Sequence, residues 1–240
     1  MLYAGDSRSM ATGIYEVAKK IFLETIKPVA SESLRLSPDA LIYGTGLLSL
    51  ITFQTPMLFL FIVTLLSLFA SNMLGATMST FIPQDTPPAK ATDRCIPGLY
   101  SPTLARITLL SDLANPSGFP AMPMFILSSV LSYCAAGVIQ LSDVLNELGP
   151  DYKAKIPTVL TLSSLLIIVM MIYLMVNDCN GFLVILGSAA IGGLFGTLMS
   201  IIIPLIFGQE SINILGLPLF VQRDAKGQPL YICAVKQPAA

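Results

Sequence analysis

The side chains that could do chemistry are few in this chain. It contains no histidine, the residue that most often donates or accepts a proton near neutral pH, and this excludes many enzyme mechanisms. Its four cysteines are scattered singly, without the paired spacing of a zinc site or the density of a disulfide scaffold. They are Cys95, Cys134, Cys179 and Cys233. We therefore expect structural thiols, and the sequence predicts no catalytic residue, no metal site and no cofactor.

Long uncharged stretches dominate the sequence. Each of four such stretches exceeds the roughly 20 residues that cross about 30 Å of hydrocarbon as a helix. They span residues 40–84, 113–142, 156–177 and 179–209. Charged residues make up 11% of the chain and its mean hydropathy is +0.77, whereas soluble domains carry about 25% charged residues. The composition predicts an all-α polytopic membrane protein, integral to the membrane and in contact with lipid.

The first uncharged stretch is too long for a single crossing. Its 45 residues would form a helix of about 67 Å, twice the bilayer core. Gln54, Thr55 and Pro56 form the natural break. Together with three later segments this predicts a bundle of about five transmembrane helices, or four if the first leg is only half inserted. The expected helices lie near 40–54, 57–81, 120–141, 157–177 and 182–207.

Three segments lie outside this bundle, which spans 40–207. Residues 1–39 include apolar side chains at three- and four-residue steps between positions 14 and 29, which predicts an N-terminal amphipathic helix that lies in the headgroup region or packs on a partner. The loop 82–118 contains six prolines, too many for a long helix. The tail 208–240 has the pattern of a β-hairpin. We expect contacts with other proteins through this loop and this tail.

Charge gives a weak orientation. With five crossings, eight Lys and Arg residues share the face that holds the N-terminus and the 82–118 loop, and five lie on the other face. With four crossings the face with both termini holds ten and the other face three, a stronger positive-inside bias. The net charge is −1 and the basic residues form no cluster, so nucleic acid is not an expected partner.

Two short segments resemble motifs of a known family. The first stands where the Pro-rich loop meets a predicted helix and consists of Asn115, Pro116, Ser117, Gly118 and Phe119. It resembles the Pro-Ser-Gly-His motif of the type 2 phosphatidic acid phosphatase superfamily. One helix hairpin later, residues 170–181 look like that family's third motif, which reads Ser-Arg, five residues, His, three residues, Asp. The order of loop, motif, helix, connection, helix, motif and Gly-rich helix over about residues 85–207 is similar too.

The residues that perform the family's chemistry are replaced in this chain. The nucleophilic His falls at Asn177, the Asp that orients it at Gly181, and the proton-donating His at Phe119. The phosphate-binding Arg falls at Met171, and the Ser before it at Met170. For the first motif, which reads Lys, six residues, Arg-Pro, the loop offers only Lys90 and Arg94 without that spacing.

These replacements remove the reaction. Neither Asn nor Phe can act as nucleophile or proton donor, and Met cannot form the charge-assisted contacts that Arg makes with phosphate. Ser117 and Tyr173 remain, but a hydroxyl without a base is more often a helix cap or a buried hydrogen-bonding group. The resemblance therefore implies a shared fold in a pseudoenzyme that is not a phosphatase.

A few other residues have a predicted structural role. Gly192 and Gly196 form a small-xxx-small face that lets another helix approach closely, more often within a chain than between chains. Asp178 could mark an ion path, but its place at a helix end favours a solvated turn. Gln54 and Gln140 are expected to hydrogen-bond at helix ends or between helices.

The resulting expectation is a non-catalytic structural membrane protein that anchors or scaffolds a larger assembly. Such bundles resemble membrane proteins of large icosahedral DNA viruses, which anchor an internal membrane beneath the capsid, so the chain could be a minor capsid protein of a virion. A cellular assembly subunit would have the same features. The alternative is a lipid-binding or transport protein that retains a headgroup cleft at the end that holds Ser117 and Asn177.

Overall fold

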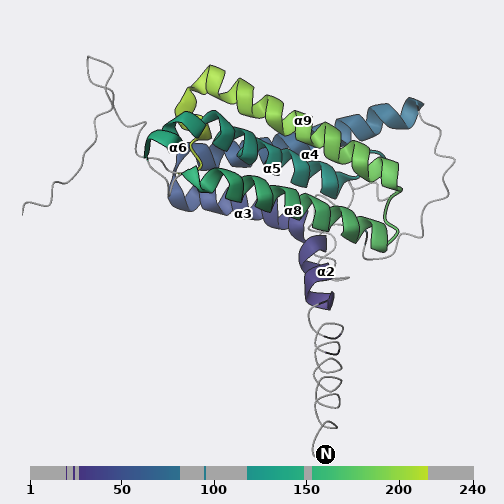
Figure 1. Cartoon of the computed structure of the whole chain (residues 1–240). Coiled ribbons are helices and arrows are strands. Elements are labelled where there is room, and N and C mark those ends of the chain that lie inside the picture. Colours follow the sequence, from purple (N-terminus) through teal and green to yellow (C-terminus); the bar gives the residue numbers. More distant parts are fainter. Residues whose placement is uncertain are drawn as a thin grey trace, which may run out of the picture.

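The computed structural model describes residues 20, 24, 27–81, 95, 118–148 and 153–215 (Figure 1). These residues are almost all helical, and no strand occurs among them. The helices are α2 (Lys27–Arg35), α3 (Ser37–Thr52), α4 (Thr55–Phe81), α5 (Met122–Gln140), α6 (Ser142–Leu148), α8 (Lys155–Val176), α9 (Phe182–Phe207) and the 3₁₀ turn η2 (Gln209–Ile212). The predicted amphipathic helix at 14–29 lies largely outside the described residues, and the predicted hairpin lies wholly outside them.

Four of these helices are long and apolar enough to cross a membrane: α4, α5, α8 and α9. Their bounds agree with the expected segments to within two residues at each end. Helix α3 has 16 residues, which corresponds to about 24 Å and is shorter than the hydrocarbon core.

The expected break in the first uncharged stretch is present, with a shifted boundary. Helix α3 ends at Thr52, and Phe53 takes a left-handed conformation with φ 50°, which is costly for a bulky side chain. Helix α4 already begins at Thr55, so Pro56 lies in its first turn instead of in the break. Proline is tolerated there because the first N–H groups of a helix have no intrahelical partner.

Helix α5 lies at the centre of the bundle. Figure 1 shows it between α9 and α8, with α4 behind, and α9 makes the most extensive contact with it. Many of its side chains are therefore buried, including Met124, Phe125, Ile126 and Tyr133, each 0% exposed. A helix that is apolar all round suits such a position because neighbours cover every face.

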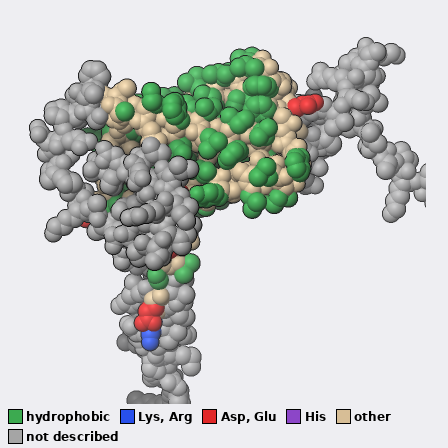
Figure 2. Space-filling model, turned by 180° about the vertical axis from the view of Figure 1, so that it is seen from behind, with side chains coloured by type: hydrophobic (Ala, Val, Ile, Leu, Met, Phe, Trp, Pro, Cys, Tyr) green, Lys and Arg blue, Asp and Glu red, His purple; other side chains and the backbone are tan. Residues whose placement is uncertain are grey.

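The outer surface of the bundle is apolar. Leu183 and Leu205 of α9 are each 80% exposed, and Leu162 and Leu165 of α8 are more than half exposed. Figure 2 shows hydrophobic side chains spread over one face of the bundle, with charged side chains visible at one edge and on the segment that projects from the bundle. An exposed apolar surface of this extent is unfavourable in water and suits lipid.

Two elements differ from the sequence-based expectation. The connection after α5 contains helix α6, which is not among the helices expected from the sequence. After α9, Gly208 with φ 88° turns the chain back, and the Tyr133 hydroxyl donates to the Ser211 backbone oxygen at 3.5 Å. Ile212 is 2% exposed, so the first residues beyond 208 pack on the bundle. The hydrophobic burial of Ile212 favours this position over an extended tail.

Candidate functional site

The phosphatase-like segments meet at one end of the bundle. We call the end that holds the α8–α9 turn the turn end, and the end that holds α6 and η2 the opposite end (Figure 1). Phe119 lies just before α5, Asn177 ends α8, and Gly181 is the N-cap residue of α9, so all three are at the turn end. Pro116 and Ser117 lie outside the described residues.

The side chain of Asn177 completes the last turn of α8. Its Nδ2 donates to the Tyr173 backbone oxygen at 2.8 Å, and its backbone N–H donates to the same oxygen at 3.2 Å. The next residue, Asp178, is exposed and has φ 51°, which ends the helix. Asn177 therefore satisfies a helix-end carbonyl at the position that the resemblance aligns with the family's nucleophile.

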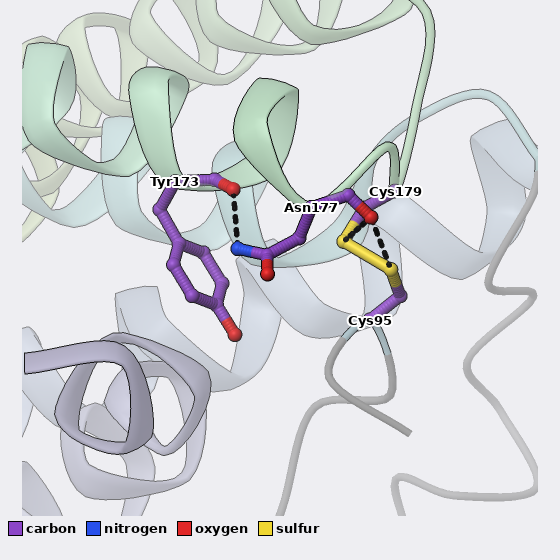
Figure 3. Close-up of a disulfide and its surroundings, with 4 residues drawn as sticks. All are labelled: Cys95, Tyr173, Asn177 and Cys179. Carbon is purple, nitrogen blue, oxygen red and sulfur yellow. Dashed lines mark hydrogen bonds between the residues drawn. A yellow bond between two sulfur atoms is a disulfide. The ribbon is translucent and has the colours of Figure 1, made fainter. Parts of the chain in front are cut away.

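A disulfide bond lies beside this helix end. Cys95 and Cys179 are joined, with Cα atoms 5.2 Å apart, within the usual range for a bridged pair. The Asn177 backbone oxygen is 3.6 Å from the Cys95 sulfur and 3.8 Å from the Cys179 sulfur (Figure 3). Our expectation of separate structural thiols is thus wrong for these two cysteines, while Cys134 is unpaired among the described residues.

The sequence held one signal for this bond. The two cysteines are 84 residues apart, so their spacing carries no pattern. A topology of helices that cross in alternation nevertheless places the 82–118 loop and the α8–α9 turn on one face. Two single cysteines on the same face, one in a tight turn, are candidates for pairing whatever their separation.

Apolar side chains fill the space below the disulfide. Met170 is 1% exposed, Leu174 2% and Tyr173 8%, and they form one cluster with residues of α5 and α9. Met171, at the position that the resemblance aligns with the phosphate-binding Arg, packs against the edge of this cluster. Such side chains stabilise the contact of α8 with α5 by burial, and Met171 supplies no charged group for phosphate.

Phe119 holds the start of α5 against α9. A Cβ atom at Gly187 would lie 3.1 Å from the Phe119 ring, so the ring packs on the bare backbone of that glycine. Two residues later the Ala121 backbone N–H donates to the Ser188 hydroxyl at 2.7 Å. Ser188 satisfies one of the free N–H groups at the start of α5. Phe119 is therefore a packing residue.

Gly192 and Gly196 form a close seam between α9 and α5. A Cβ atom at Gly192 would lie 2.6 Å from the Phe125 backbone oxygen, and one at Gly196 2.8 Å from the Ser129 carbonyl carbon. Real Cβ atoms do not approach so closely, so only glycine permits this helix separation. The seam lies within the chain.

Gln140 adds polar contacts near the end of the same seam. Its Nε2 donates to the Ser200 backbone oxygen at 3.2 Å and to the Ser200 hydroxyl at 3.1 Å. This confirms the expected interhelical role of Gln140. Gln54 is exposed at the α3–α4 break, and its backbone oxygen accepts from the backbone N–H of Leu58 at 3.2 Å, so the residue lies at a helix end, while the predicted role of its side chain stays a prediction.

Comparison with known proteins adds no relative. No protein-family model, no curated protein and no solved structure matches the chain. Within the described residues, no group of three or more Cys, Asp and Glu residues is placed to hold a metal ion. The roles given above therefore rest on the geometry of this chain alone.

Proposed function

We propose that the chain is a non-catalytic, multi-pass structural protein of a membrane, whose bundle anchors or scaffolds a larger assembly. The observation that supports this proposal is the set of side chains found at the turn end. The positions of the phosphatase motifs hold a helix cap at Asn177, a packing ring at Phe119 and a buried apolar cluster around Tyr173. These side chains stabilise a rigid bundle and include neither an imidazole nucleophile nor a charged phosphate ligand.

The proposal includes five crossings, with α3 as the first. Helix α3 lies beside α4 and the break at Phe53 reverses the chain (Figure 1). Leu34, just before α3, packs against the cluster that contains Tyr173 at the turn end. Helix α3 itself spans about 24 Å, which approaches the hydrocarbon thickness, and Leu34 places its start at the turn end. This favours a full crossing over a half-inserted leg.

The assembly that we propose is a membrane lined by a protein shell, such as the internal membrane beneath the capsid of a large icosahedral DNA virus. The partners would bind the 82–118 loop and the 208–240 tail. The support for these two segments is a general argument. The outer surface of the bundle is covered by side chains that suit lipid, such as Leu183 and Leu205, so contacts with other proteins would have to use segments outside the membrane.

Native mass spectrometry of the chain extracted from its own membrane in mild detergent tests this proposal. A protein partner at a fixed ratio is the expected result. A chain that carries a single lipid species and no protein would instead support lipid binding at the turn end and contradict the structural role. The Cys95→Ser/Cys179→Ser variant is the informative comparison. Because it releases the loop, it should lower the fraction of chain that is bound to the protein partner, while the amount of nonspecifically bound lipid stays the same. Cys134→Ser is its matched control.

A phosphatase assay tests the non-catalytic part. Purified chain in mixed micelles with phosphatidic acid should release no phosphate above the buffer. Release that Asn177→Ala abolishes, and that the control substitution Gly44→Ala leaves intact, would contradict the proposal.

A further inference from the structure

The Cys95–Cys179 disulfide bears on a question that charge leaves open, namely which compartment each end of the bundle faces. The count of Lys and Arg favours one face by eight to five with five crossings and the other face by ten to three with four. Which face of the membrane carries more basic residues thus depends on whether α3 crosses the membrane. The disulfide does not depend on α3, because it joins the turn between α8 and α9 to a residue between α4 and α5.

We infer that the turn end faces an oxidising compartment and that the opposite end, with the chain beyond α9, faces the reducing cytosol. Disulfides form and persist on the exoplasmic side of membranes and are rare in the cytosol. The inference rests on the membrane-spanning arrangement proposed above and adds its direction.

The chemistry requires this environment. In the bond-forming step, each thiol loses its proton, the S–S bond forms, and two electrons pass to the disulfide of a thiol oxidase, which leaves as a dithiol. Such oxidases act on the exoplasmic side. In the cytosol, the thioredoxin and glutathione systems keep newly made thiols reduced, so the bond would not form before the pair is buried.

The placement of the pair argues that the bond persists once formed. Cys95 is 8% exposed and Cys179 2% exposed, so a reducing thiolate has little access to either sulfur. The surrounding cluster contains Leu174 and Met170, and apolar cover of this kind raises the cost of bringing a charged thiolate close.

The charges next to α8 agree with this direction. The turn between α8 and α9, residues 177–181, contains no Lys or Arg. Lys153 and Lys155, in contrast, lie at the N-terminal end of α8. Positive charge beside short connections favours the cytosolic side. With the five crossings proposed above, the N-terminal segment and the 82–118 loop place eight basic residues at the turn end and give the contrary bias, so charge alone does not decide.

Reporter fusions to the full chain test the direction. The expected result in bacteria is that green fluorescent protein after residue 240 fluoresces, which requires the cytosol, and that alkaline phosphatase at the same point is inactive, because it needs the oxidising periplasm. The reverse pair of signals would overturn the inference. Extraction at alkaline pH separates this failure from failure of the proposed function, because a chain that alkali releases from the membrane would contradict both.

Thiol counting tests the bond in the same cells. The Cys233→Ser chain, denatured without reductant, should take one maleimide, at Cys134, and three after reduction. Adding Cys134→Ser should lower these numbers to zero and two. Three maleimides without reductant would show that the pair is reduced in the membrane, which would overturn the inference whatever the reporters show.

Discussion

Helices α9 and α8 both pack on α5, yet they do so in different ways. Helix α9 approaches α5 until the backbone at Gly192 and Gly196 meets Phe125 and Ser129. Helix α8 contacts α5 through larger side chains such as Met170, and it contacts α9 little although a short turn joins them. In lipid, where apolar side chains gain nothing by leaving the solvent, close backbone packing is the stronger device. Helix α8 depends in part on the covalent link at its end instead.

The largest effect should follow the addition of one methyl group to the seam. Gly196→Ala places a Cβ atom against the Ser129 backbone, which cannot rotate away, so the helices must separate. Overpacking of this kind costs about 3 kcal/mol. SDS-induced unfolding in mixed micelles measures the change in the free energy of unfolding.

Gly44→Ala is the matched control for that substitution. A Cβ atom at Gly44 would meet no atom within 4 Å, so the same methyl group should leave stability unchanged or raise it by up to ~1 kcal/mol through helix propensity. Equal losses for the two variants would mean that the seam is no tighter than the surface of α3.

The second effect concerns the link at the end of α8. Cys95→Ser/Cys179→Ser should lower the free energy of unfolding by about 2 kcal/mol, the lower part of the usual range for a disulfide, because inserted helices already restrain the unfolded chain. The same unfolding assay measures it. Reduction of the wild-type chain should reproduce the loss, and Cys134→Ser should not.

A smaller effect is expected from the polar contact at the end of the seam. Gln140→Leu removes both hydrogen bonds to Ser200 and should cost about 1 kcal/mol. A double-mutant cycle with Ser200→Ala isolates the bond to the hydroxyl, for which the coupling energy should be about 0.6 kcal/mol. Zero coupling would mean that only the backbone oxygen matters.

The smallest effect should come from the outer face of α8. Leu165 is 57% exposed and should face lipid, so Leu165→Ala should change the free energy of unfolding by less than ~0.5 kcal/mol. Met170→Ala, on the buried face of the same helix, should cost about 2 kcal/mol through the cavity that it leaves. Similar costs for both would mean that α8 is covered by protein on its outer face.

The hydrophobic pattern of the sequence predicted much of the fold, because uncharged runs of more than 20 residues have few alternatives to a helix in lipid. The α9 segment was predicted at 182–207, which are its observed bounds. The burial of Ile212 could not be predicted, because a single apolar residue after a helix has no periodicity. At the candidate site, the helix-end hydrogen bond from Asn177 to Tyr173 is local to one helix, whereas the contact of the Phe119 ring with Gly187 depends on the arrangement of the helices and could not be predicted.

The position of the disulfide also has a consequence for the order of synthesis. The sequence between Cys95 and Cys179 contains α5, α6 and α8, so the bond can form only after the ribosome has delivered all three and both long helices have inserted. A chain in which α8 fails to cross leaves Cys179 on the wrong side of the bilayer and stays reduced. With the orientation inferred above, the oxidised chain is therefore a record that α5 and α8 have inserted, and a cell that retains proteins with free thiols would hold back chains in which they have not.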